Sequence, residues 1–308
     1  MAVRTGGSAR IALRTRGTAA NRRRHSQSPL IKGVIRTARH PLGGVGLILL
    51  AILVLSALTA PWIAPYNPLA QHPGYELHGP GLPFLFGTDQ FGRDLLSRVI
   101  YGIRPSLAVS LIVVGLGGSV GIGAGLVAGF LGGWVEAIIT RMFDALFAFP
   151  AIMLGFVVVA ASGPGTTQVA YAIALSSVPS LGRVARALVL RERHRDYVLA
   201  ARSMGARTSR IMFRHILPNA VAPMFVNIAL LMGFAVLAEA GLAFLGLGTQ
   251  PPLPSLGGML NESRSYLRAD PWLAVWPGVA LALLLLGLNY VADALREAFD
   301  PRRVNIGV

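Results

Sequence analysis

The sequence predicts an all-α polytopic membrane protein with about six transmembrane helices. Of its 308 residues, 54% are hydrophobic and only 13% are charged, whereas a soluble domain carries roughly 25% charged residues. Several apolar runs reach about 20 residues, the length that crosses the hydrocarbon core of a bilayer as a helix. Because lipid offers no hydrogen-bond partners, such runs must satisfy their own backbone groups, and a helix does so.

We expect six spans, each at an apolar run of sufficient length. They cover approximately residues 43–63, 107–130, 138–161, 168–190, 225–247 and 272–292. The segment between the first two, residues 64–106, is rich in proline and glycine and carries charges of both signs, namely Asp89, Asp94, Arg93, Arg98 and Arg104. We interpret it as an external loop within a membrane domain that covers residues 39–308.

The N-terminal segment, residues 1–38, contains many arginines and no acidic residue, since the first acidic residue is Glu76. Small and polar residues fill most of the rest, so we expect a basic, disordered cytoplasmic tail. A signal peptide is disfavoured, because the basic region is too long and the apolar run at 43–60 is long enough to span.

The net charge of +15 would indicate nucleic acid as a partner of a soluble protein. Here the basic residues flank membrane spans, so we expect a lipid bilayer and no nucleic acid. A second basic cluster lies between the fourth and fifth spans, at Arg186, Arg191, Arg193, Arg195, Arg202, Arg207, Arg210 and Arg214. Because basic loops remain in the cytoplasm, this cluster and both termini are expected inside.

The second span carries a glycine at every fourth position, namely Gly117, Gly121, Gly125 and Gly129. On a helix these positions form one stripe of small residues, which lets another helix approach closely. The stripe is a candidate for a helix that lines or closes a pathway. Tight packing within the bundle is the alternative interpretation.

A charged segment, residues 196–218, stands between two long apolar runs. Its pattern predicts a helix, a break at Gly205, a second helix and a stop at Pro218, with Pro223 interrupting any further helix before the fifth span. Three arginines share one face of the second helix, at Arg207, Arg210 and Arg214. The residues alone leave two interpretations open, a helix lying on anionic lipid or a docking element for a soluble protein.

The order of residues in this segment resembles the cytoplasmic EAA loop of bacterial ABC importer permeases. That loop reads Glu-Ala-Ala, three residues, Gly, and then Leu-Pro twelve and thirteen positions after the Gly. The matching residues here are Ala200, Ala201, Gly205, Leu217 and Pro218. Leu199 occupies the family's glutamate position, which removes one potential ionic contact with a partner.

Further segments resemble one subgroup, the C-type permease subunit of dipeptide, oligopeptide and nickel ABC importers. They include APWIAPYNP, GTDQFGRDLLSRVIYGIRPSL, GGWVEAIITRMFDALFAFP, EAGLAFLGLGTQPPLPSLGGML and NYVADALREAFDP. The resemblance covers about residues 38 to 303 with similar spacing. It implies the type I ABC importer permease fold and a role as a pore-forming subunit for di- or oligopeptides, with nickel or another peptide-like solute as the alternative.

The resemblance also implies partners. These are a second (B-type) permease, two ATPases as separate subunits or one fused chain, and an external substrate-binding protein. The loop at residues 191–222 would seat in a groove of an ATPase and couple ATP hydrolysis to transport. Its candidate coupling residues are Asp196, Ala200, Ala201, Arg202, Gly205, Arg207, Arg210, Leu217 and Pro218.

The sequence lacks the residues of several other chemistries. No GxxxxGK[ST] phosphate loop exists, and the only lysine, Lys32, is followed by Gly33, so ATP and Mg are expected in the partner subunits and no enzymatic activity or cofactor in this chain. There is no cysteine. No histidine pair has metal-ligand spacing, and His72 and His78 are expected to be solvated residues of the external loop.

Few ionisable residues fall inside the expected spans. Glu239 is a pathway candidate that would contact a cationic group, with a paired or protonated structural role as the alternative. Arg141 and Asp144 are i, i+3 neighbours and are expected to form a helix-stabilising pair. An ATP-independent transporter or channel would show more intramembrane charge, and a membrane enzyme would need a convergent cluster of His, Asp or Glu.

Overall fold

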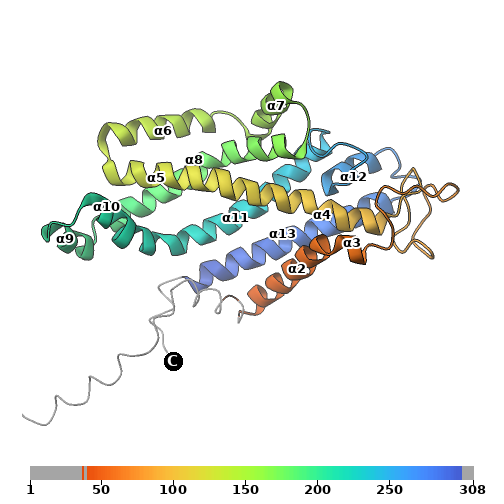
Figure 1. Ribbon diagram of the computed structural model, residues 1–308, viewed down its shortest axis with the longest axis horizontal. Coiled ribbons are helices and arrows are strands. Elements are labelled where there is room, and N and C mark those ends of the chain that lie inside the picture. Colours follow the sequence, from red (N-terminus) through yellow and green to blue (C-terminus); the bar gives the residue numbers. More distant parts are fainter. Residues whose placement is uncertain (1–36, 38–39, 300–308) are drawn as a thin grey trace, which may run out of the picture.

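The computed structural model describes residues 37 and 40–299, so the expected tail at residues 1–38 lies outside the described part except for Thr37. Helices dominate this part (Figure 1), and no β-strand occurs within it. The helices are α2 (Pro41–Leu58), α3 (Ala60–Ile63), α4 (Leu95–Ile112), α5 (Ser119–Leu131), α6 (Gly133–Phe147), α7 (Ala151–Ser162), α8 (Thr166–Glu192), α9 (Asp196–Ser203), α10 (Thr208–Arg210), α11 (Leu217–Phe244), α12 (Leu256–Ser263) and α13 (Trp272–Ala298), with π-helical segments η1 (Val113–Gly118) and η2 (Ile211–Ile216).

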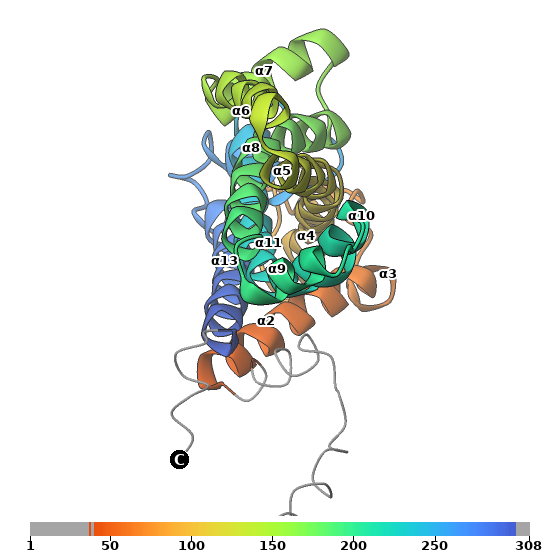
Figure 2. The same ribbon diagram turned by 90° about the vertical axis from the view of Figure 1, so that its left-hand side faces the viewer.

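Five helical stretches are long and apolar enough to cross a membrane, and a bent pair makes a sixth, so the prediction of an all-α protein with about six spans is confirmed. The five are Pro41–Leu58, Leu95–Leu131, Thr166–Glu192, Pro223–Phe244 and Trp272–Ala298. Figure 2 looks along the molecule from the end that carries α9 and α10, with α2 and α13 at one edge and α6 and α7 at the opposite edge.

The expected third span, residues 138–161, was wrong as a single helix. It is divided into α6 and α7, whose axes differ in direction by 84°. The break follows from Pro150, which has no backbone N–H and disfavours helical conformation at the preceding residue. Pro150 itself is extended, with φ −56° and ψ 139°, and α7 begins after it.

The second span begins earlier than expected, because residues 95–106 are helical and not part of a loop. Asp94 starts the helix by accepting a hydrogen bond from the backbone N–H of Ser97 at 2.8 Å, which is the standard chemistry of an N-cap. The helical stretch from Leu95 to Leu131 is 37 residues long. At a rise of about 1.5 Å per residue it exceeds the thickness of a bilayer, so one end projects into the aqueous phase.

The glycine stripe packs against α8. A Cβ atom at Gly121 would lie 2.5 Å from the carbonyl oxygen of Val178, and one at Gly129 would lie 2.9 Å from that of Arg186. Gly117 and Gly125 approach α8 in the same way, at Ala174 and Gly182. Tight packing within the bundle is therefore confirmed, whereas a pathway role for the four glycines stays a prediction.

Replacing Gly125 with leucine is expected to separate α5 from α8 and to destabilise the fold by at least about 1–3 kcal/mol, since a side chain has no room there. The thermal unfolding midpoint of the detergent-purified protein measures this. Gly123 is the matched control, because it lies on the same helix with no atom within 4 Å of an added Cβ. Equal midpoints for G125L and G123L would contradict the packing argument.

Candidate functional site

The basic loop, residues 191–222, contains one short helix with a complete Schellman cap. After α9, Gly205 adopts a φ of +73°, a conformation that suits glycine. Its N–H donates to the carbonyl of Arg202 at 3.0 Å, and the N–H of Ala206 donates to that of Ala201 at 3.1 Å. These two hydrogen bonds define the motif and fix the turn. The predicted break at Gly205 is confirmed.

Apolar contacts anchor α9 to the body of the protein. Val198 is fully buried and Ala201 is 3% exposed, and both pack in a cluster with Ala185 and Val189 of α8 and Ile216 of η2. Ala201 therefore faces the protein interior, although it is one of the candidate coupling residues, and it is not itself exposed to a partner. On the opposite face Ala200 and Arg202 are exposed.

A polar contact joins both ends of the basic loop, and sequence reasoning missed it. The hydroxyl of Tyr197 donates to the buried carboxylate of Glu192 at 2.9 Å, and the side-chain amide of Asn219 donates to the same hydroxyl at 3.3 Å. Burial and the hydrogen bond to Glu192 raise the pKa of Tyr197, so its hydroxyl remains a donor at neutral pH. Tyr197 thereby connects the end of α8 to the start of α11.

The predicted stop at Pro218 is wrong. From Thr208 onward the chain is helical through η2 and into α11, which continues to Phe244 with Pro218 in its first turn and Pro223 inside it. Because the helix is continuous here, the proline leaves one carbonyl of the preceding turn without its usual N–H donor. The wider π-helical turn just before Pro218 relieves crowding of the proline ring. Leu217 is partly buried and Pro218 exposed.

A basic hollow lies on the exposed side of the loop. Its volume is about 900 Å³ and its lining includes Met204, Gly205, Arg207, Arg210 and Arg214. The three arginines are exposed, so the structure brings them together around one concavity as their spacing predicted. Met204 is 80% exposed at its rim. Asp196 lies in the first turn of α9, where its negative charge interacts favourably with the positive end of the helix dipole.

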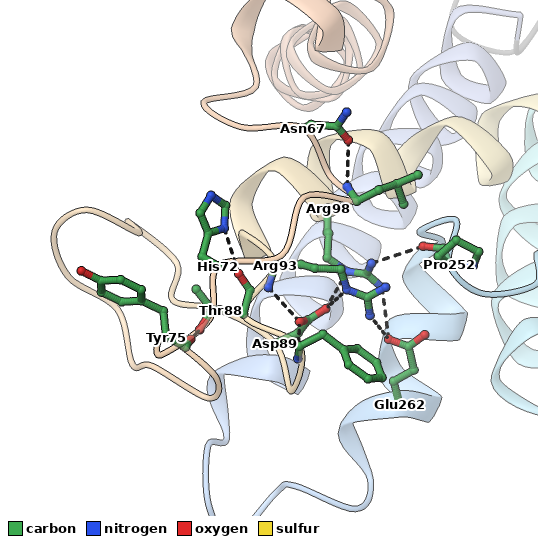
Figure 3. A network of polar contacts seen from close by, with 12 residues as sticks. Asn67, His72, Tyr75, Thr88, Asp89, Arg93, Arg98, Pro252 and Glu262 are labelled. Carbon is green, nitrogen blue, oxygen red and sulfur yellow. Dashed lines mark hydrogen bonds and ion pairs between the residues drawn. The ribbon is translucent and has the colours of Figure 1, made fainter.

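The opposite end of the molecule is closed by a network of buried charges, shown in Figure 3. Asp89 accepts hydrogen bonds from the backbone N–H and the Nε of Arg93, at 3.0 and 2.6 Å, and lies 3.3 Å from Nε of Arg98. Arg98 also donates to Glu262 of α12 at 3.1 Å and to the carbonyl of Pro252 at 3.4 Å. Arg98 is 1% exposed. The network joins the long loop, residues 64–94, to α4 and α12.

The two histidines of the long loop have structural contacts. His72 Nδ1 lies 3.0 Å from the carbonyl oxygen of Gly92, and its ring contacts those of Tyr66 and the buried Phe84. His78 Nδ1 lies 2.8 Å from the carbonyl oxygen of Gly79. Within residues 37 and 40–299, no group of three or more His, Cys, Asp or Glu residues has the arrangement of a metal site.

Glu239 and Asp144 each have a polar partner on a neighbouring helix. Glu239 is fully buried, and the Ser106 hydroxyl donates to its Oε2 at 2.6 Å. Glu239 therefore lies in the contact between α4 and α11, which agrees with the alternative of a structural, hydrogen-bonded role. A pathway role for Glu239 stays a prediction. The prediction that Arg141 pairs with Asp144 is wrong, because Asp144 pairs instead with Arg183 of α8, at 2.7 Å.

A bundle of helices long and apolar enough to cross a membrane, with a capped basic loop at one end, is the architecture of a multi-pass membrane subunit. Residues 121–305 match the family described as binding-protein-dependent transport system inner membrane component. Residues 28–80 match the N-terminal TM domain of oligopeptide transport permease C. The chain belongs to this family of C-type permeases and is a multi-pass membrane subunit.

Its relatives include a dipeptide transport system permease protein, DppC, from Alkalihalophilus pseudofirmus, 39% identical with 89% of this chain and 90% of that one covered. The di/tripeptide transport system permease protein DppC from Pseudomonas aeruginosa is 42% identical, with 90% and 94% covered. The glutathione transport system permease protein GsiD from Escherichia coli is 39% identical, with 87% and 88% covered.

The fold is similar to a chain of the MetNI methionine ABC transporter in an inward-facing conformation. The TM-score is 0.55 at 17% identity, with 66% of this chain and 96% of that chain covered. At this identity the likeness concerns the fold alone. The predicted type I ABC importer permease fold is confirmed.

Removing the carboxylate of Asp89 is expected to destabilise the end of the molecule that carries the long loop. D89A leaves Arg93 and Arg98 buried without their main counter-charge, which costs about 3–5 kcal/mol. Limited proteolysis of residues 64–94 in the purified protein measures the effect. E76A is the matched control, because it removes an exposed carboxylate from the same loop. Equal cleavage of the two variants would refute the network's role.

The variant Y197F is expected to loosen the basic loop without unfolding the protein. It removes two hydrogen bonds, each worth about 1 kcal/mol. Amide hydrogen exchange of residues 196–206 should become several-fold faster. Y171F serves as control, since Tyr171 is exposed on α8. Unchanged exchange in Y197F would show that the apolar anchor alone holds α9.

Proposed function

We propose that this chain is the C-type permease of an ABC importer for di- and oligopeptides. The observation that carries the proposal is the identity of about two residues in five to peptide permeases, extending over 89% of this chain and 90% of the first relative. A match of this length covers the spans, the basic loop and the long loop together. The chain would form the translocation pathway with a second, B-type permease.

In this proposal ATP hydrolysis takes place in partner subunits. The sequence has no P-loop lysine, so ATP and Mg would bind to separate or fused ATPases, and this chain would be a non-enzymatic pore subunit. A soluble substrate-binding protein would deliver the peptide from outside. The supporting observation in this chain is the basic loop, whose exposed hollow offers a shaped surface to a soluble protein.

The geometry of the basic loop supports a mechanical role. The Schellman cap holds α9 at a fixed angle, and the chain is helical without a break from Thr208 to Phe244. A displacement of the loop would therefore pass directly to α11. Val198 and Ala201 would pass the same displacement to α8 through their contacts with Ala185 and Val189. An ATPase seated in the hollow would in this way move two spans together.

The proposed orientation places the basic loop in the cytoplasm. The arginine bias supports it, as does the position of the basic loop and the long loop at opposite ends of the long axis (Figure 1). With this orientation the start of α2 and the end of α13 would also lie toward the cytoplasm. The long loop and α12 would then face the substrate-binding protein.

Substitutions at Arg202 and Gly205 test the docking of the ATPase. R202E reverses an exposed charge, and G205L forces a branched side chain into a left-handed conformation, which costs about 1–2 kcal/mol. Both are expected to reduce co-purification of the ATPase and peptide uptake by at least roughly tenfold while membrane insertion persists. R268E is the control for co-purification of the ATPase, because Arg268 is an exposed arginine between α12 and α13, at the other end of the molecule from the basic loop.

Unchanged ATPase association and peptide uptake in R202E and G205L would refute the docking assignment. The substrate is tested separately in the reconstituted complex, with the binding protein loaded in turn with dipeptides, longer peptides and nickel. Stimulation of ATP hydrolysis by peptides supports the proposal. Stimulation by nickel alone would show that nickel, and not a peptide, is the substrate.

A further inference from the structure

A cavity of about 500 Å³ opens beside the α6–α7 bend, between α8 and α11. Its walls are mainly apolar and include Phe149 and Phe234. Four polar side chains also line it, Ser176, Ser177 and Ser180 from α8 and Asn227 from α11. An apolar cavity with a few polar groups is the usual form of a binding site for a small ligand.

The cavity lies deep within the membrane-spanning part. At about 1.5 Å per helical residue, Ser180 is about 21 Å from the start of α8 at Thr166 and about 18 Å from its end at Glu192. Polar side chains at this depth face the bundle interior or a water-filled space, because lipid does not solvate them. The position therefore indicates a solvated space near the middle of the bilayer.

The polar groups of the cavity retain unused hydrogen-bonding capacity. Asn227 donates through Nδ2 to the carbonyl of Pro223 at 2.9 Å, and its Oδ1 accepts no hydrogen bond from the described residues. Ser180 is exposed and likewise has no hydrogen-bond partner within the described part of the chain. One amide oxygen and one hydroxyl are thus available to a ligand that carries both donors and acceptors.

An ion pair lies about one helical turn from the cavity toward α9. Arg183 of α8 donates through Nη2 to Asp144 of α6 at 2.7 Å, and the two side chains are 46% and 49% exposed. The guanidinium also stacks on the ring of Phe147, a cavity residue, with 4.2 Å between Cζ and the ring centroid. Its Nε and Nη1 make no hydrogen bond with any described residue, so part of the fork is uncommitted.

The polar groups of α8 follow one face of the helix. Ser176, Ser180 and Arg183 are spaced i, i+4 and i+7, which aligns them along a single stripe. The stripe runs from the cavity toward the end of α8 that anchors the basic loop. A stripe of this kind provides consecutive polar contacts along the direction in which a solute crosses the membrane.

We propose that this cavity and Arg183 form a transit site for the carboxyl-terminal end of a peptide. Peptides of different sequence share two features, backbone amides and a terminal carboxylate. Ser180 and Asn227 match the amides, and the uncommitted edge of Arg183 matches the carboxylate, which an arginine fork binds strongly. The apolar walls accept side chains without selecting among them. This proposal rests on the proposed peptide transport and names the substrate group that the pathway recognises.

Uptake of a dipeptide and of its C-terminal amide by the reconstituted complex tests the role of Arg183. R183M should lower uptake of the free acid roughly tenfold more than uptake of the amide, each measured relative to the wild-type complex. R183K should restore part of the difference. R186M is the matched control, because Arg186 also joins α8 to α6, through a 2.7 Å hydrogen bond from its Nε to Glu136, but does not stack on a cavity residue as Arg183 does on Phe147.

Three results would overturn the assignment and are distinguishable. If the wild-type complex imports dipeptides and R183M lowers uptake of acid and amide by the same factor, Arg183 does not bind the carboxylate and the transit site is wrong. If the wild-type complex imports no peptide, the proposed function fails and the transit site fails with it. A selective effect of R186M equal to that of R183M would also overturn the assignment.

Thiol labelling tests the cavity independently. The chain has no cysteine, so S180C introduces its single thiol. A small hydrophilic thiol reagent should label S180C in the assembled complex, and saturating dipeptide with the binding protein should slow the reaction. I48C, at an exposed apolar position of α2, should remain unlabelled. No labelling of S180C would show that the second permease covers the cavity, and labelling without peptide protection would show that no peptide passes it. Either result overturns the proposal.

Discussion

The close contact between α5 and α8 organises the rest of the structure. In a bilayer the lipid tails are as apolar as the helix surfaces, so helices associate through van der Waals packing rather than through removal of apolar surface from water. The glycines at 117, 121, 125 and 129 provide that packing by bringing backbone against backbone. Because α8 is fixed in this way, it can carry an anchor for the basic loop at one end and an open polar stripe in its middle.

The two ends of the molecule achieve order by different means. At the end with the long loop, the charged side chains are largely buried and form ion pairs with one another, namely Asp89, Arg93, Arg98 and Glu262. At the other end the three arginines of the basic hollow are exposed and a small apolar cluster holds α9 in place. The first arrangement gives a rigid cap over the helices. The second leaves a charged and shaped surface exposed while its backbone remains fixed.

Hydropathy alone was sufficient for the number of spans, and glycine chemistry was sufficient for the turn at Gly205, because both depend on local sequence. The bend at Pro150 and the continuous helix through Pro218 were not predictable in the same way. The same residue type breaks one helix and lies within another, and the difference comes from the π-helical turn before Pro218. The hydrogen bond of Asn219 to Tyr197 and the pairing of Asp144 with Arg183 join residues that are 22 and 39 positions apart in the chain, so no local pattern indicates them.

The contrast between enclosed and exposed charge gives the two ends different responses to ionic strength. Salt screens exposed charges over a Debye length of about 8–10 Å under physiological conditions and acts far less on buried pairs. The cap built on Asp89 and Arg98 should therefore keep its shape across dilute and concentrated media. Association at the basic hollow, where Arg207, Arg210 and Arg214 are open to solvent, should weaken as salt rises. One chain thus combines a salt-tolerant face with a salt-responsive face.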